Sequence, residues 1–281
     1  MILVTGANGA FGRRIVEYLL DRPAKLAVSV REPARAAALA AKGVDVRHGD
    51  FDVPETLAKA YEGAETILIN ATNYGSAVSG RIVAQLSPVL QAAKAAGAER
   101  LVITTWQDLD NCPLPYAQDF RTVEDLARNA FPTAIVLRMT YGMAASVARD
   151  VQWAEATGVL TAPAGAARVA PAATDDLAAA AANAVLTAAA AARTYDLTGP
   201  DAIDWNDLAG LAGVDYRAID DDQFRTQAEA AGFPPEAVGM LLDYYAAFRS
   251  GWAGAPTTDL ADLLGRRPAS SLDAVRQAKS R

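Results

Sequence analysis

The sequence of 281 residues contains a single cysteine, Cys112, and a single histidine, His48. One thiol excludes an intrachain disulfide and a cysteine-based metal cluster, and it is typical of a reducing compartment. A zinc site needs several such ligands, so we expect no metal site and interpret His48 as a loop residue. The composition therefore favours neither a metalloenzyme nor a disulfide scaffold.

Basic side chains are scarce and scattered. Lysine occurs only at positions 25, 42, 59, 94 and 279, and the formal net charge is −7. A nucleic-acid groove needs clustered basic residues, so we expect no nucleic-acid partner. No apolar run reaches the length of about 18 residues that a membrane span needs, and a secretory signal pattern is missing. We expect a cytoplasmic protein that does not bind membranes.

What the sequence does contain is a glycine motif near residue 1. An apolar strand is expected over residues 2–4, followed at once by glycines at spacing three and by a helical pattern. In a dinucleotide-binding unit these glycines permit a tight turn, close approach of a pyrophosphate and close packing of the helix, whose N-terminus faces the phosphates. The residues expected to bind the dinucleotide here are Gly6, Asn8, Gly9, Ala10, Phe11 and Gly12.

Apolar runs and helical patterns alternate beyond this motif. Such alternation is typical of a parallel sheet with crossover helices, so the predicted fold class is α/β, a Rossmann-type doubly wound parallel sheet. The expected strands are residues 2–4, 26–30, 44–46, 66–70, 100–105 and 133–137, and the expected helices between them are 34–41, 55–61, 80–96 and 119–130.

The regular alternation fades after about residue 141, and the composition changes beyond residue 200. We expect a dinucleotide-binding domain over 1–200, with an excursion at about 141–170 that lines a cleft, and a smaller, mostly helical substrate domain over 201–281. In the latter, apolar and aromatic side chains repeat at helical spacing and could line a pocket or form core. They are Leu241, Tyr244 or Tyr245, Phe248 and Trp252.

The second expected strand ends at Arg31, and Arg35 follows four residues later. An acidic residue at this place binds the ribose of NAD, whereas an arginine accommodates the additional phosphate of NADP. Both arginines could reach one anion if a helical turn places them on the same face. We therefore predict NADP(H) as the cofactor, and we expect Asp50 and Phe51, after the third strand, to border the adenine.

The sequence lacks the Tyr-x-x-x-Lys pair with which conventional short-chain dehydrogenases move a proton to or from their alcohol. The residues four positions before its lysines are Asp21, Ala38, Glu55, Leu90 and Val275. After the fifth expected strand the chain instead has Tyr116-Ala117-Gln118-Asp119-Phe120, with phenylalanine in place of the cation. This absence argues against a conventional alcohol dehydrogenase.

The chain resembles the atypical short-chain dehydrogenases of the NmrA-like group, in particular NADPH-dependent quinone oxidoreductases and triphenylmethane reductases. The matching segments, spread over nearly the whole length, are residues 5–12, 30–36, 92–98, 136–138, 195–199 and 263–268. The resemblance implies an NADPH-binding Rossmann domain with a small C-terminal domain. It implies that Gly6, Gly9, Gly12 and Arg31 hold the phosphates, and that Ala71, Thr72 and Asn73 pass close to the nicotinamide ribose.

The chain also departs from that group. Relatives tend to carry histidine or lysine where Phe120 stands, so no proton-donating role carries over to position 120. Hydroxyl groups at the carboxyl ends of the strands are the remaining candidates, because such folds bind ligands there. We expect Thr105, Tyr141 and Tyr116 as catalytic candidates and Thr104 as a further hydroxyl beside the cofactor.

Three functions remain open on these grounds. Hydride addition to a quinone gives a delocalised oxyanion that needs little acid catalysis, so an NADPH-dependent reductase of a quinone or small aromatic acceptor is favoured. The alternatives are a non-catalytic NADP(H) sensor that binds a protein partner, and a tailoring reductase acting on a polycyclic aromatic intermediate. The expected assembly is a monomer or a homodimer.

Overall fold

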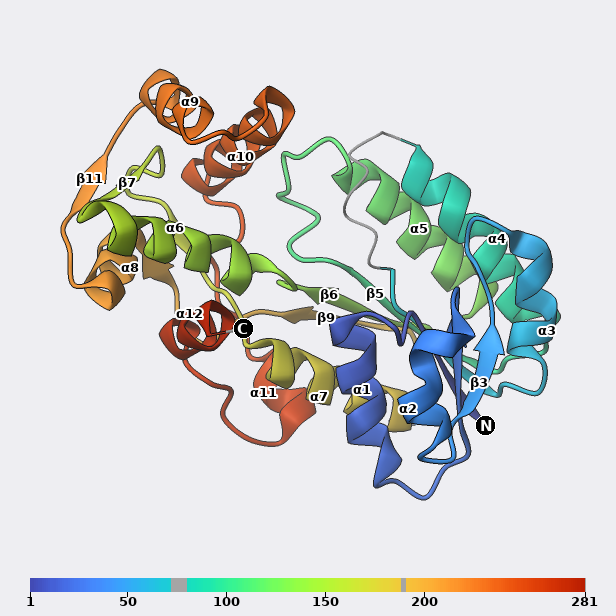
Figure 1. The fold of residues 1–281 in the computed structure, drawn as a ribbon. Coiled ribbons are helices and arrows are strands. Elements are labelled where there is room, and N and C mark those ends of the chain that lie inside the picture. Colours follow the sequence, from blue (N-terminus) through green and yellow to red (C-terminus); the bar gives the residue numbers. More distant parts are fainter. Residues whose placement is uncertain (72–79, 188–190, 281) are drawn as a thin grey trace. The chain divides into compact units, whose positions relative to one another are not determined.

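The computed structural model describes residues 1–71, 80–187 and 191–280 (Figure 1). The chain forms two compact units, each assembled from separate segments. The first unit contains Met1–Leu109, Pro115–Met139 and Leu177–Asp196. The second contains Asp110–Leu114, Thr140–Asp176 and Leu197–Arg281.

A seven-stranded sheet forms the centre of the first unit, in the order β3-β2-β1-β4-β5-β6-β9. Every pair from β3 to β6 is parallel, with Val4 of β1 opposite Val28 of β2 and Leu68 of β4. The strands are β1 (Ile2–Thr5), β2 (Leu26–Val30), β3 (Asp45–His48), β4 (Thr66–Ile69), β5 (Arg100–Trp106), β6 (Ile135–Met139) and β9 (Arg193–Leu197). This order, with the reversal at β1, confirms the predicted Rossmann-type doubly wound fold.

Strand β9 adds a seventh member that the sequence pattern did not assign to this sheet. Arg193 N donates to Ala134 O near one end of β6, and Thr140 N donates to Leu197 O near the other. Residue numbers therefore rise in the same direction along both strands, so β9 also runs parallel to β6. The chain returns to the sheet after its long excursion into the second unit.

Helices cover both faces of this sheet, with α4 and α5 together on one side and α1 and α2 on the other (Figure 1). Residues of the central strands, such as Leu3, Ile67 and Ile103, have no exposed surface. Burial on both faces explains why these strands read as continuous apolar runs. The helical elements are α1 (Ala10–Leu20), η1 (Pro33–Ala36), α2 (Ala37–Ala40), η2 (Pro54–Thr56), α3 (Leu57–Tyr61), α4 (Arg81–Ala95), α5 (Ala117–Ala130) and α7 (Thr174–Leu186).

The second unit is mostly helical, with two small two-stranded sheets. Helix α6 packs against α8 and α12, and α9 packs against α10. The elements are α6 (Met143–Thr157), β7 (Leu160–Ala162), β8 (Arg168–Val169), β10 (Ile203–Asp204), α8 (Trp205–Ala212), β11 (Tyr216–Ala218), α9 (Asp221–Ala230), α10 (Pro235–Arg249), α11 (Asp259–Leu264) and α12 (Ser271–Lys279).

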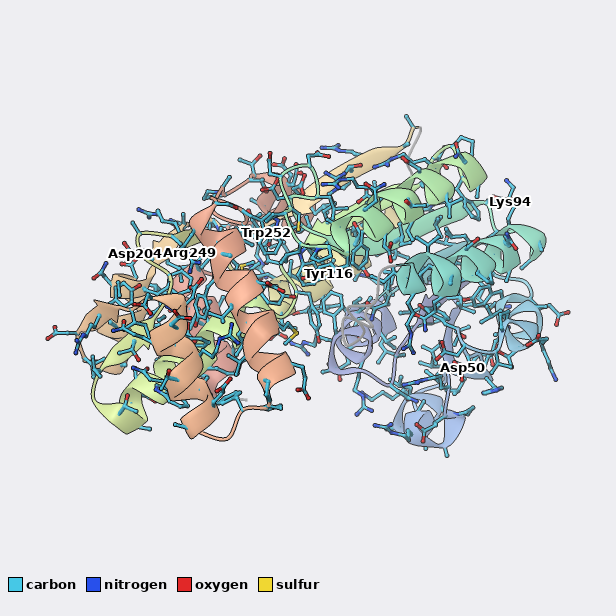
Figure 2. The ribbon with its side chains drawn as sticks, turned by 90° about the horizontal axis from the view of Figure 1, so that it is seen from above. Asp50, Lys94, Tyr116, Asp204, Arg249 and Trp252 are labelled. Atoms are coloured by element: carbon cyan, nitrogen blue, oxygen red, sulfur yellow. The ribbon has the colours of Figure 1, made fainter. Side chains whose placement is uncertain are left out.

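Side-chain caps fix the starts of two helices in this unit. Asp204 accepts from the backbone N–H groups of Asn206 and Asp207 at the start of α8, and Asp220 caps α9 in a similar capping box (Figure 2). Each such cap contributes about 1 kcal/mol to helix stability. Directly after the cap of α9, Asp221 accepts from Arg249 of α10 through both carboxylate oxygens at 3.0 Å, which ties α10 to the start of α9.

The structure groups Thr140–Asp176 with the C-terminal residues, whereas the sequence pattern kept 141–170 as an excursion of the first domain. The reason is packing, because α6 buries its apolar side against α8 and α12. Assignment of one unit to the cofactor and the other to the substrate stays a prediction. Among the described residues, no helix is long and apolar enough to cross a membrane.

Candidate functional site

A pocket in the first unit lies where the chain leaves β1, β2 and β4, and α4 and α5 complete its wall. Parallel sheets of this kind bind ligands at the carboxyl ends of their strands, beside the point where the strand order reverses. The lining residues are Gly6, Asn8, Gly9, Ser29, Val30, Arg31, Glu32, Arg35, Gly49, Asp50, Phe51, Asp52, Asn70, Ala71, Ile82, Gln85, Leu86 and Phe120.

The glycine turn has the geometry that its sequence predicts. Gly6 has φ +70°, a left-handed conformation that favours glycine, and its N–H donates to Ser29 O of β2 at 3.0 Å. A Cβ atom on Gly12 would lie 2.5 Å from Gly6 O, so only glycine lets α1 pack this closely against the turn. Gly6 and Gly9 line the pocket, whereas Ala10, Phe11 and Gly12 do not. Phe11 and Gly12 are buried and position the helix.

This turn fits a bound dinucleotide. No side chain caps the N-terminus of α1, and its first turn contains no acidic residue, so an anion would be stabilised there. Asn8 Nδ2 donates to Glu32 O, but the buried Asn8 Oδ1 and the buried hydroxyl of Ser29 have no hydrogen-bond partner in the described part of the chain. Polar atoms left in this state indicate that the pocket receives a polar ligand.

Two arginines reach this pocket from the end of β2. Arg35 Nη1 lies 3.2 Å from Glu32 Oε1 in an exposed ion pair. No carboxylate of the described residues pairs with the Arg31 guanidinium, which is exposed at the pocket. Arg31 is therefore the cation available to an anionic ligand, and a phosphate is the group that a guanidinium fork binds best.

Asp50 and Phe51 line the pocket on the side of β3 (Figure 2). Asp50 Oδ1 accepts from Asp52 N at 3.0 Å, which fixes the carboxylate at the end of the strand. Our sequence reasoning missed several lining residues, among them Asn70 and Gln85. Asn70 could have been predicted, because it is a polar residue directly after β4 and such strand ends face the ligand. Gln85 could not, because it lies in a helix and belongs to no motif.

A buried polar network holds the chain where it leaves β4. Asn70 N donates to the Thr5 hydroxyl at 2.9 Å, and Ala71 N donates to the Thr104 hydroxyl at 3.0 Å. Thr104 in turn donates to Asn70 Oδ1 at 3.4 Å. Thr104 thus supports Asn70 and Ala71 from behind and does not line the pocket itself. Thr72 and Asn73 lie outside the described residues.

The hydroxyl of Thr105 belongs to a different buried network. Thr105 Oγ1 donates to Glu124 Oε1 at 2.8 Å, and the same carboxylate binds Arg138 through Nε and Nη2 at 2.9 Å each. Thr105 has no exposed surface and does not line the pocket. In this arrangement its proton is directed at Glu124 rather than at a ligand.

Tyr116 is placed differently, at the start of α5 (Figure 2). Its ring meets Trp106 edge-on at a centroid distance of 5.5 Å and Phe120 at 6.5 Å. Phe120 lines the pocket, so Tyr116 stands one aromatic ring away from it. Of the three hydroxyl candidates, Thr105 and Tyr116 lie in the first unit and Tyr141 lies in the second, directly before α6.

The aromatic stripe of α10 lines a second pocket, which lies wholly within the second unit. Leu241, Tyr244, Tyr245 and Phe248 are among its lining residues. Trp252 is buried and stacks on Phe248 at 5.8 Å without lining that pocket. The stripe is thus partly core and partly pocket wall, so both roles expected from the sequence apply to some of its residues.

Comparison with known proteins agrees with this fold and with NAD(P)H binding. Residues 6–130 match a family of NAD(P)H-binding proteins. Quinone oxidoreductase 2 of Escherichia coli is 29% identical, with 98% of this chain and 97% of that protein covered. The NAD(P)H azoreductase of Xenophilus azovorans is 25% identical over 88% of this chain and 86% of that protein.

Solved structures give the same result. Triphenylmethane reductase from Citrobacter sp. superimposes with a TM-score of 0.90 at 25% identity, covering 100% of this chain and 99% of the other. The NADPH complex of an Escherichia coli NADPH-dependent quinone oxidoreductase superimposes with a TM-score of 0.88 at 27% identity, covering 99% of each chain.

The sheet, the glycine-turn pocket and the family match indicate an NAD(P)H-binding protein with a Rossmann fold, and the quinone oxidoreductase and azoreductase relatives support the class of NAD(P)H-dependent oxidoreductases. Within this class, the whole-length relatives confirm the resemblance to the NmrA-like group of atypical short-chain dehydrogenases.

Proposed function

We propose that this protein uses NADPH to reduce a quinone or another conjugated aromatic acceptor by direct hydride transfer, without a Tyr–Lys pair. The observation that carries the choice of NADPH is Arg31, which lies in the same pocket as Gly6 and Gly9 and has no carboxylate partner among the described residues. The 2′-phosphate that distinguishes NADPH from NADH is the anion that an arginine at this position accommodates. Relatives named as NADPH-dependent quinone oxidoreductase and NAD(P)H azoreductase support the reaction class.

The residues of the first unit supply binding and orientation. The glycine turn and the start of α1 would hold the pyrophosphate, Arg31 with Arg35 the 2′-phosphate, and Asp50 with Phe51 the adenine end. Asn70 and Ala71, held by Thr5 and Thr104, would border the nicotinamide ribose. Bound NADPH supplies the hydride, and the protein contributes its orientation.

The proton balance favours a quinone. Reduction of a quinone to a hydroquinone takes up one hydride and one proton, and the delocalised oxyanion can take that proton from water or from a hydroxyl group. An ordinary ketone gives a strongly basic alkoxide and needs a positioned acid. Tyr116 is the hydroxyl best placed to assist within the first unit, because its ring contacts Phe120, which lines the pocket. Tyr141 is retained as a second candidate, whereas Thr105 would first have to release Glu124.

A steady-state assay tests this function. The protein is mixed with NADPH and a panel of quinones, azo dyes and simple ketones, and loss of the cofactor's absorbance is recorded. We expect turnover with the quinones and none with the ketones. Tight binding of NADPH without turnover on any acceptor would contradict the proposal and favour an NADP(H) sensor that acts through a protein partner.

A further inference from the structure

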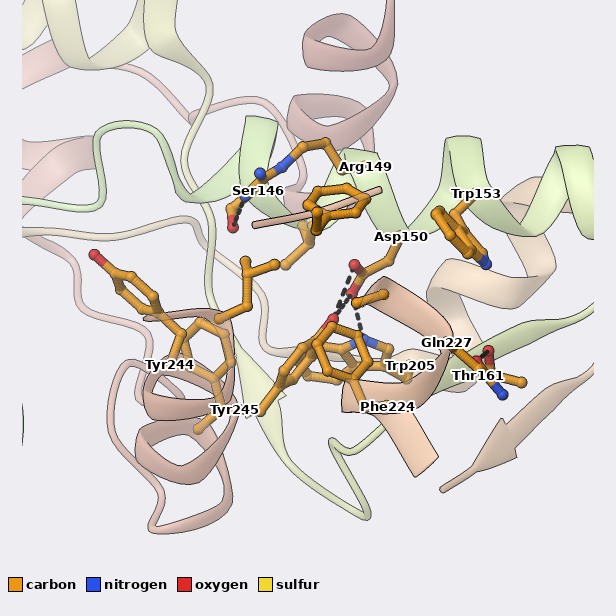
Figure 3. Close-up of a pocket in the computed structure, with 15 residues that line it drawn as sticks. Ser146, Arg149, Asp150, Trp153, Thr161, Trp205, Phe224, Gln227, Tyr244 and Tyr245 are labelled. Atoms are coloured by element: carbon orange, nitrogen blue, oxygen red, sulfur yellow. Dashed lines mark hydrogen bonds between the residues drawn. The ribbon is translucent and has the colours of Figure 1, made fainter. Parts of the chain in front are cut away.

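The pocket of the second unit is lined by many aromatic side chains and by two charged residues, Asp150 and Arg149 (Figure 3). Helices α6, α8, α9 and α10 contribute most of its wall. The side chains that matter for its chemistry are Asp150, Trp153, Trp205, Phe224, Phe233 and Tyr245. None of them belongs to the dinucleotide pocket of the first unit.

The aromatic rings form an inner and an outer group. Trp205 and Tyr245 are buried with their ring centroids 5.9 Å apart, and Phe224 meets Tyr245 edge-on at 5.2 Å. Trp153 and Phe233 are partly exposed and lie 6.2 Å apart. A ligand would therefore meet ring faces and edges on several sides of the pocket, from its exposed part to its floor.

Asp150 projects from α6 into the middle of these rings (Figure 3). Its Oδ2 accepts from Trp205 Nε1 at 2.8 Å, and the Tyr245 hydroxyl lies 2.9 Å from each of its oxygens. Two donors use about half of the roughly four acceptor positions of a carboxylate. Asp150 is still partly exposed, so the remaining positions can be reached from the pocket.

Both of these donors are neutral, and no lysine or arginine of the described residues pairs with Asp150. Arg149, which precedes it on α6, also lines the pocket, but it is exposed and its Nη2 binds the Ser146 hydroxyl at 3.1 Å. A carboxylate among apolar side chains without an ion-pair partner is unfavourable, and burial raises the pKa of Asp150 to about 6, although the nearby charge of Arg149 acts in the opposite direction. At neutral pH most molecules therefore carry a negative charge on Asp150 that no ion pair of the described residues neutralises.

We propose that the pocket of the second unit binds an aromatic organic cation, with its positive group against Asp150 and its ring among the aromatic side chains. A carboxylate attracts the charge, and the faces of Trp and Tyr rings attract the same group through cation–π interactions. A small metal ion would lack the oxygen ligands that it needs, because Asp150 is the only carboxylate among the described residues that line this pocket. Binding here does not require a dinucleotide, so the inference stands apart from the proposed reductase activity.

Isothermal titration calorimetry of the full-length protein without dinucleotide tests the inference. The probe is trimethylphenylammonium chloride, which is inert to hydride, and its neutral isostere tert-butylbenzene reports the apolar contribution. We expect one cation site per chain and binding at least about tenfold weaker in D150N, which keeps the shape of the side chain but not its charge. Binding of the neutral isostere should be the same in both proteins.

The matched control is D243N on α10, an exposed carboxylate of the same unit that does not line the pocket. This variant loses the same charge and should bind the cation as the wild-type protein does. Unchanged affinity in D150N, or no saturable binding of the cation to the wild-type protein, would overturn the inference.

If D150N fails to fold, as judged by near-UV circular dichroism, the variant F233L tests the inference by the same titration. Phe233 is partly exposed, so its replacement by leucine keeps an apolar side chain but removes a ring face. In this variant the affinity for the cation should fall more than the affinity for tert-butylbenzene. Equal weakening of both ligands would contradict cation recognition by the rings.

Discussion

The hydroxyl oxygen of Tyr245 lies 2.9 Å from both carboxylate oxygens of Asp150. Because this hydroxyl has one proton, it bridges the two oxygens and stabilises the ionised carboxylate. Burial acts in the opposite direction and is the larger effect, so the pKa of Asp150 is raised to about 6. Burial and the adjacent carboxylate also raise the pKa of Tyr245, which keeps its proton in place.

A dependence of stability on pH follows from this pair. The pKa of Asp150 is about 6 in the folded state against 3.8 in its model value, so the folded protein holds the proton more tightly. Stability contributed by this group therefore falls as the pH rises from about 4 to about 6. D150N removes that dependence, and its free energy of unfolding relative to wild type should rise across this window by up to about 3 kcal/mol.

Urea unfolding at several pH values measures this difference. The charged and titratable groups that act on Asp150 or on its partner Tyr245 are Arg149 on α6 and Tyr216 on β11. D243N serves as the control, and its free energy of unfolding relative to wild type should not rise between about pH 4 and pH 6. A difference between D150N and wild type that is the same at every pH would contradict the assignment.

Arg31 sets the preference between cofactors in the proposed site. Replacement by alanine removes a charge-assisted hydrogen bond to the 2′-phosphate, so NADPH should bind about 10- to 100-fold more weakly while NADH is little affected. Fluorescence titration with both dinucleotides measures the effect. The control is R225A in α9, which makes the same substitution in the other unit and should alter the affinity for neither dinucleotide. An equal loss for NADPH and NADH would refute the phosphate contact.

Gly12 should not tolerate a side chain. In G12A the new Cβ would lie 2.5 Å from Gly6 O and 2.8 Å from Gly6 C, so the glycine turn or α1 must shift. We expect a loss of stability of about 1–3 kcal/mol and weaker dinucleotide binding. G210A in α8 is the matched control, because a Cβ there meets nothing within 4 Å and alanine favours a helix by about 1 kcal/mol. Thermal unfolding of both variants gives the comparison, and a G12A protein as stable as wild type would show that the turn is not tightly packed.

Tyr116 is expected to assist protonation only modestly. In Y116F the ring contacts with Trp106 and Phe120 are kept and only the hydroxyl is lost. We expect kcat with a quinone to fall by about tenfold, below the usual effect of a dedicated acid, with unchanged NADPH affinity. Y141F, measured in the same way, compares the second candidate. Unchanged kcat and an unchanged pH profile in Y116F would remove Tyr116 from the reaction.

Much of the first unit could be predicted from the sequence, because local patterns carry its signals. Strands buried on both faces appear as apolar runs, and the glycine turn and Arg31 are defined by their distance from β1 and β2. Short pairings such as β8 with β10 escaped notice, since two residues are too few to show a period. A strand is predicted at 195–198, but the place of β9 beside β6 is not, because it depends on the return of a distant segment.

The pocket around Asp150 could not be predicted in this way. In the sequence, Arg149 and Asp150 are an adjacent charged pair on a helix, which is typical of a solvated surface. Trp205 and Tyr245, which surround the carboxylate, are 55 and 95 residues away and belong to two other helices. Only tertiary packing brings them together, and no local motif encodes that contact.

The packing of α12 against α6 constrains the order in which the protein can mature on a ribosome. The first unit has most of its sheet once β6 has emerged, and α8 follows, but α12 is complete only at Lys279, more than one hundred residues after α6 ends. Until then α6 lacks one of the two helices of the C-terminal segment against which it packs. The second unit is thus completed last, and a fragment that starts at residue 201 would lack the helix around which that unit is built.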